Sequence, residues 1–146
     1  MPKVVKSLLV PFSSSQMYEL INNVAAYPEF LPWCKSAIVH SNAATKLHAT
    51  LCIGKGLISQ SISTRNTMVP NEQITMEYQA GPFKNCTGGW EFISTVDNKC
   101  QVNFFMQYEF SSMFNAMTLE PIFTPLANTL IDAFYKRAQE LYGSES

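Results

Sequence analysis

Hydrophobic and polar residues alternate along the middle of the chain, from Ser36 to Phe110. Alternation with a period of two is typical of antiparallel strands that bury one face. The turn-forming segments that interrupt it are Gly54-Lys55-Gly56, Pro70-Asn71, Gly81-Pro82 and Asp97-Asn98. The pattern predicts about six strands joined as a meander, and the aliphatic segment 4–10 predicts one more strand before them.

A helix is predicted directly after the first strand. Ser13 is a suitable N-cap, and Gln16 completes a capping box three residues later. Phe12 and Met17 flank this start as a hydrophobic staple. The apolar residues that follow recur at helical spacing, so one face of this helix is expected to be buried.

The aromatic segment 27–34 predicts a second, short helix. Pro28 suits the first helical turn. Pro32 disfavours helical geometry at Leu31 and is expected to end the helix there. A loop carrying Trp33 then leads into the sheet.

The C-terminal part returns to helical spacing and predicts one long amphipathic helix. Its apolar stripe consists of Phe123, Leu126, Ala127, Leu130, Ile131, Phe134, Ala138 and Leu141. Pro121 and Pro125 predict a break or kink near residues 120–125. Thr124 and Pro125 also form a plausible cap and first position of a helix.

The element order is therefore strand, two helices, six strands and a long helix, an α+β arrangement in which the helix covers one face of the sheet. That face is rich in aromatic rings and methionines, which either fill a core or line a cavity for an apolar ligand. Tyr78 and Tyr108 lie on it, and each needs a hydrogen-bond partner when buried.

Composition limits the classes of function. The chain has 146 residues, of which 47% are hydrophobic and 14% are charged, and we expect a single domain over residues 1–146. No apolar run approaches the about 20 residues of a membrane span. The start lacks a secretory signal, so the cytoplasm is the expected location. A net charge of −1 does not favour binding to DNA.

Cysteine and histidine spacing does not predict a metal or a catalytic site. Cys34, Cys52, Cys86 and Cys100 form no C-x-x-C motif, and free thiols are expected in a reducing compartment. The chain offers no sequence-adjacent ligand partner to either histidine. We therefore predict no cofactor, no metal and no catalytic residue.

Several motifs nevertheless carry a family resemblance. They are Ser13-x-x-Gln16-Met17-Tyr18-x-Leu20, Tyr27-Pro28-x-Phe30-Leu31-Pro32-x-Cys34, Thr64-Arg65-Asn66, Gly81-Pro82-Phe83-Lys84, Gly88-Gly89-Trp90-x-Phe92 and Tyr108-Glu109-Phe110. In this order and spacing, the chain resembles the bacterial and mitochondrial coenzyme Q-binding START-like family, part of a polyketide cyclase-like superfamily.

The resemblance implies a helix-grip, Bet v 1-like fold whose hydrophobic tunnel holds ubiquinone or a similar polyprenyl lipid. It implies a carrier that supports respiration, without catalysis. The residues expected to line the tunnel are Phe30, Leu31, Trp33, Met76, Tyr78, Phe83, Trp90, Phe92, Phe104, Met106, Tyr108, Phe110, Phe123, Leu130 and Phe134. Tyr78, Tyr108 or Gln60 would supply hydrogen bonds to the quinone ring.

Alternatives remain open at this point. The bacterial members of the family imply a toxin-like role on the large ribosomal subunit, and the superfamily implies a cyclase or aromatase. Trp33 is either an anchor at a membrane surface or a lid on its own domain. Arg65 either pairs with Glu77 or Glu91 or contacts the ligand.

Overall fold

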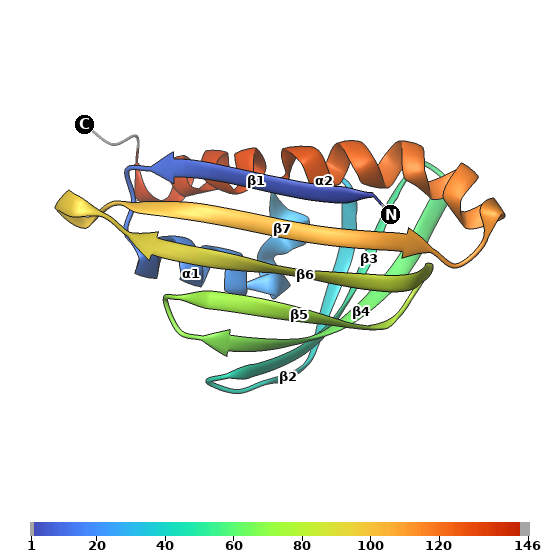
Figure 1. The fold of residues 1–146 in the computed structure, drawn as a ribbon, viewed down its shortest axis with the longest axis horizontal. Helices are drawn as coiled ribbons and strands as arrows, with labels where there is room; N and C mark the ends of the chain where they lie inside the picture. The colour runs from blue at the N-terminus through green and yellow to red at the C-terminus, as the bar shows by residue number, and fades with distance from the viewer. Residues whose placement is uncertain (1, 144–146) are drawn as a thin grey trace.

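The computed structural model describes residues 2–143 (Figure 1). These residues form seven strands, two α-helices and two 3₁₀ helices. In chain order they are β1 (Lys3–Val10), α1 (Ser14–Asn22), η1 (Val24–Glu29), β2 (Cys34–Asn42), β3 (Lys46–Lys55), β4 (Ile58–Val69), β5 (Gln73–Ala80), β6 (Phe83–Ser94), η2 (Val96–Asn98), β7 (Cys100–Phe110) and α2 (Met113–Tyr142).

All the strands belong to one 7-stranded sheet in the order β1-β7-β6-β5-β4-β3-β2. Every neighbouring pair is antiparallel. The sheet is strongly curved, and α2 runs along the length of the molecule beside β1 and β7 (Figure 1). This arrangement confirms the predicted α+β helix-grip fold.

Local turn chemistry explains the meander. Asp97 and Asn98 have φ of 61° and 59°, a left-handed conformation that these residue types tolerate, and they close the hairpin between β6 and β7. Asn71 has φ of 66° in the turn after β4. The predicted turns at Pro70-Asn71 and Asp97-Asn98 are therefore confirmed.

The start of α1 follows its sequence signal. The Ser13 side chain accepts a hydrogen bond from the Gln16 amide at 3.1 Å, and the Gln16 side chain accepts one from the Ser13 amide at 2.9 Å. Phe12 and Met17, the predicted staple, are both buried. The capping box is confirmed.

The second helix differs from the prediction. It is a 3₁₀ helix that begins at Val24, so Pro28 lies near its end instead of in its first turn. Backbone bonds of the i→i−3 type from Ala26 to Asn23 (3.1 Å) and from Phe30 to Tyr27 (3.2 Å) hold it. Asn23, which caps α1, thus also starts η1, and the chain turns without an intervening loop.

The long C-terminal helix forms as predicted: α2 is one element of 30 residues with Ser112 as its N-cap, and it has no break at Pro121 or Pro125. Thr124 therefore lies inside the helix and does not begin a new one. Pro121 and Pro125 are both exposed and four residues apart, so the backbone bonds they remove lie on the outer face. The first turns of α2 are inclined to the rest (Figure 1).

None of the helices in residues 2–143 combines the length and the hydrophobicity that crossing a membrane requires.

Candidate ligand-binding site

An apolar cavity of about 120 Å³ lies between the concave face of the sheet and α2. The sheet contributes side chains from β3, β4, β5, β6 and β7. The helix covers them with Phe123, Leu126, Ala127, Leu130 and Phe134. Val24 and Tyr27 of η1 and Trp33 close one side. The cavity therefore sits where the helix grips the sheet.

Most of the residues expected to line a tunnel do line this cavity. They are Trp33, Met76, Tyr78, Phe83, Trp90, Phe104, Met106, Phe123, Leu130 and Phe134. Alternation along the strands placed the sheet residues on the correct face. Whether they contact a ligand stays a prediction.

The other expected residues pack beside the cavity and do not line it. Leu31 and Tyr108 have no exposed surface. Phe92 packs edge-on against Tyr18, with ring centroids 5.8 Å apart. Phe110 lies 5.2 Å from the Phe83 ring. These side chains pack in the core because other elements cover them, such as Tyr18 of α1 over Phe92 and Phe123 of α2 over Tyr108, which period-two alternation does not reveal. Phe30 is the fifth expected residue that does not line the cavity.

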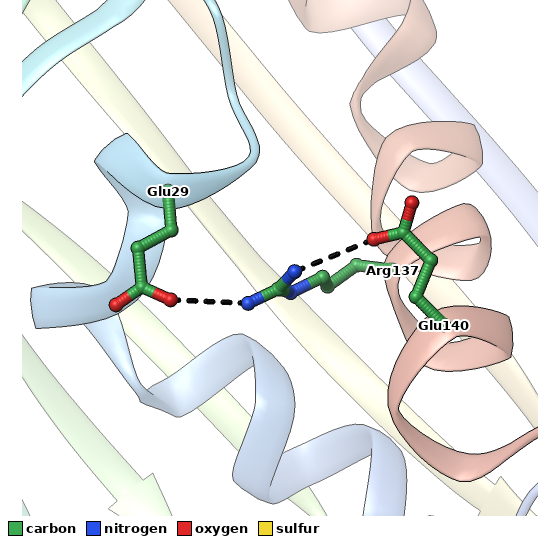
Figure 2. Close-up of polar contacts among 3 residues, drawn as sticks. All are labelled: Glu29, Arg137 and Glu140. Atoms are coloured by element: carbon green, nitrogen blue, oxygen red, sulfur yellow. Dashed lines mark hydrogen bonds and ion pairs between the residues drawn. The ribbon is translucent and has the colours of Figure 1, made fainter.

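The ring of Phe30 packs against Phe134 of α2 and against the guanidinium group of Arg137. Its ring lies 5.6 Å from that of Phe134, and the Arg137 guanidinium stands 5.0 Å above it. Arg137 also pairs with Glu29 at 3.1 Å and with Glu140 at 3.3 Å (Figure 2). Arg137 therefore links η1 to α2.

Hydrogen bonds already engage the two tyrosines that were expected to serve the ligand. The hydroxyls of Tyr108 and Thr124 lie 2.8 Å apart and share one hydrogen bond. The Tyr78 hydroxyl accepts a bond from the Phe83 amide at 3.0 Å, so its own proton remains available. Gln60 does not line the cavity.

The bond between Tyr78 and Phe83 lies at a gap in the sheet. The β5–β6 pairing runs only from Gln73↔Glu91 to Glu77↔Thr87. Beyond it, the side chains of Tyr78, Phe83 and Cys86 line the cavity instead. The wall of the cavity is held there by side chains and not by a backbone ladder.

Sequence reasoning missed Asn66 and Thr64, two polar residues of the wall. Asn66, on the inner face of β4, is 7% exposed and lines the cavity. Its Oδ1 is enclosed and has no hydrogen-bond partner among residues 2–143. Thr64 lines the cavity two residues earlier. The alternation that placed Ile62 and Thr64 inward also places Asn66 there, so the signal was present.

Titratable side chains of the wall are neutral at physiological pH. Burial raises the pKa of the Cys86 thiol to about 11. Burial also raises the pKa of Tyr27, with a smaller contribution from Cys34, and that of Tyr78. His48 and Glu109 do not line the cavity. In residues 2–143, no cluster of three or more His, Cys, Asp or Glu side chains is arranged to hold a metal ion.

Two further residues were predicted to have alternative roles. Trp33 is half-buried, packs on the core and lines the cavity, which is the position of a lid. Arg65 is exposed and lies opposite Glu77 across β4 and β5, but within residues 2–143 no ion pair forms between them. Within residues 2–143, Arg65 therefore neither pairs with the expected carboxylates nor lines the cavity.

Comparisons with known proteins place these features in a family context. Residues 10–135 match the family described as "Polyketide cyclase / dehydrase and lipid transport". The chain is 36% identical to a ribosome association toxin RatA of Pseudomonas aeruginosa, over 96% of this chain and 97% of that one. It is 25% identical to the mitochondrial coenzyme Q-binding protein COQ10 of Drosophila melanogaster, over 97% of this chain and 60% of the relative. A START superfamily protein from Mycobacterium smegmatis shares the fold, with a TM-score of 0.79 and 16% identity over 95% of this chain and 98% of the other.

Proposed function

We propose that this chain, which belongs to the polyketide cyclase/dehydrase and lipid transport family, binds ubiquinone or a similar polyprenyl quinone without transforming it. The observation that carries the proposal is the cavity, whose wall is almost entirely aliphatic and aromatic. Such a wall suits an isoprenoid ligand with a small polar ring. A relative named for binding coenzyme Q supports the same ligand class.

The size of the cavity determines how such a ligand would be held. About 120 Å³ is less than the roughly 300–1,000 Å³ of pockets that enclose drug-sized ligands. The quinone ring is therefore expected inside, with widening at α2 or Trp33, and the tail is expected to leave the cavity. The inner face of β4 indicates the exit, because its side chains become more exposed from Asn66 toward Ile58.

The titratable groups support binding over catalysis. General acid–base catalysis is most efficient when a group in the site has a pKa near the operating pH. The cavity wall offers only phenols and the Cys86 thiol, and burial raises the pKa of that thiol to about 11. A cyclase or aromatase would need a different set of side chains facing its substrate.

Exposed apolar side chains support transient contact with a membrane surface. Met113, Phe114 and Met117 at the start of α2 are each more than 70% exposed, and Leu57 in the β3–β4 turn is fully exposed. Apolar side chains exposed in this way are typical of surfaces that meet lipids or partners. Lys35 donates to the Gly56 carbonyl at 2.7 Å and adds positive charge beside Leu57. A quinone carrier needs such a surface to collect its lipid.

Tryptophan fluorescence tests the proposal directly. Both tryptophans of the chain, Trp33 and Trp90, line the cavity. Titration with decylubiquinone should quench them saturably near one equivalent. Ala127→Phe, which fills the cavity from α2, should weaken this quenching strongly, whereas the exposed Asn128→Ala should not. Quenching that never saturates, or that is equal in both variants, would contradict the proposal.

A second candidate function rests on the relatives named ribosome association toxin, which match almost the whole chain. In that function the chain would bind the large ribosomal subunit and prevent subunit joining. Sucrose gradients after overexpression should then show more free subunits and fewer joined ribosomes. Unchanged profiles would reject this candidate and leave the quinone proposal intact.

A further inference from the structure

Asn66 carries an uncompensated polar group in the interior. The residue is 7% exposed, and its Oδ1 is enclosed without a partner among residues 2–143. Burial of an amide oxygen without a hydrogen bond is unfavourable for folding. A leucine would fill the same space without that cost, so the stability of the fold does not account for the asparagine.

The surroundings of Asn66 are apolar. Leu47 on β3 and Met76 on β5 are its direct neighbours across the sheet. Tyr108 bonds to Thr124, whereas the Tyr78 hydroxyl accepts a hydrogen bond from the Phe83 amide and keeps its own proton free to donate. The Asn66 Oδ1 is thus an enclosed side-chain oxygen of the wall that has no hydrogen-bond partner within residues 2–143.

We propose that Asn66 recognises an oxygen of the quinone ring and so fixes the ring at the inner end of the cavity, with the tail directed past Ile62 and Trp33. This inference rests on the proposed quinone binding. The burial of the inner-face side chains of β4 indicates the direction of the tail, because burial increases along the strand toward Asn66. Ile58 is exposed, and the half-buried side chains are Gln60, Ile62 and Thr64. Asn66 and Met68 are buried. Four residues of strand, or roughly 13 Å at about 3.3 Å per residue, separate Ile62 from Asn66.

A carboxamide fits both oxidation states of such a ring. Its NH₂ group donates to the carbonyl oxygen of a quinone, and its oxygen accepts from the hydroxyl of a quinol. A lysine in its place, whose ammonium group can only donate, would favour the quinone carbonyl. Asn66 would therefore hold the oxidised and reduced ligands with similar affinity, as a carrier between redox partners requires.

The test compares two ligands with the same tail. Decylubiquinone has ring oxygens, whereas decylbenzene has none, and calorimetric titration of the full chain measures both affinities. Loss of one hydrogen bond in a buried site corresponds to about a tenfold loss of affinity. Asn66→Leu should therefore weaken decylubiquinone binding about tenfold and leave decylbenzene within twofold.

Two further variants separate recognition from packing. Leu47→Met, directly opposite Asn66 on β3, alters the packing beside Asn66 at a residue that does not line the cavity, and it should preserve the preference for decylubiquinone. Asn66→Ala should abolish that preference as Asn66→Leu does. Asn66→Leu should also raise the melting temperature by about 2–4 °C, because it removes the buried oxygen that lacks a hydrogen bond.

The outcomes are distinct. If the wild-type chain prefers decylubiquinone and both Asn66 variants lose that preference, the inference is supported. If the variants keep the preference, Asn66 does not recognise the ring, and the proposed quinone binding stands. If the wild-type chain binds neither ligand, the proposed function and the inference both fail.

Discussion

The hydroxyl of Tyr108 on β7 lies 2.8 Å from the hydroxyl of Thr124 on α2. This bond joins the sheet to the helix one residue before Pro125, at the stretch where the helix lacks backbone bonds. Tyr108 has no exposed surface, so its hydroxyl depends on Thr124 for a partner. Tyr108, which was expected to form a hydrogen bond with the ligand, thus bonds to Thr124 of α2 instead.

Tyr108→Phe is predicted to destabilise the chain without weakening quinone binding. Loss of the bond should lower the free energy of unfolding by about 0.5–1.5 kcal/mol, measured by urea denaturation. Thr124→Val removes the other partner, and the double variant should cost less than the sum of the single ones. Additive effects, or a large loss of quinone affinity in Tyr108→Phe, would contradict the structural role.

The Arg137 contacts predict that Glu29→Gln and Arg137→Ala lower the free energy of unfolding by different amounts. Glu29 is 65% exposed, so Glu29→Gln should cost less than about 1 kcal/mol, and the loss should shrink at high salt. Arg137→Ala also removes the guanidinium from the Phe30 ring and should cost more. If urea denaturation gives equal losses of unfolding free energy for the two variants, the ion pair alone accounts for the stabilisation by Arg137.

The thiols predict how stability depends on pH. Burial raises the pKa of Cys34 and of Cys86 to about 11, from an ordinary value of 9.0. Above pH 9 the unfolded chain therefore releases protons that the folded chain retains, and stability should fall as the pH rises from 9 to 11. Melting temperatures under reducing conditions measure this decline, and Cys86→Ala should make it shallower. An identical slope in that variant would indicate that the Cys86 thiol ionises normally.

The exposed side chains at the start of α2 predict reversible contact with lipid. Phe114→Ser combined with Met117→Ser should reduce cosedimentation with anionic vesicles severalfold and leave the melting temperature unchanged, because both residues are largely exposed. Thr118→Ser, on the same turn, is the control. Unchanged cosedimentation would place the contact surface elsewhere.

Sequence patterns were most informative where one local interaction decides the structure. The capping box at Ser13 and Gln16 and the turn at Asp97-Asn98 depend on neighbouring residues, and both form as predicted. Period-two alternation also placed Met76 and Trp90 on the cavity wall. These features require no knowledge of distant contacts.

The features that escaped prediction depend on tertiary contacts. Pro121 and Pro125 predicted a break or a kink without deciding between them, and contacts with the sheet and the Tyr108–Thr124 bond keep α2 a single element through Pro125. Phe92 faces inward as predicted, yet α1 covers it with Tyr18. Asn66 was overlooked because a single polar residue among alternating positions resembles an ordinary surface residue.

The account as a whole depends on a quinone occupying the cavity. Mass spectrometry of lipids extracted from the chain, purified natively from a host that makes ubiquinone, measures this most directly. We predict a polyprenyl quinone approaching one equivalent per chain, and much less with Ala127→Phe, which fills the cavity. Repeated extraction without any quinone, together with no binding of added ubiquinone, would contradict the account.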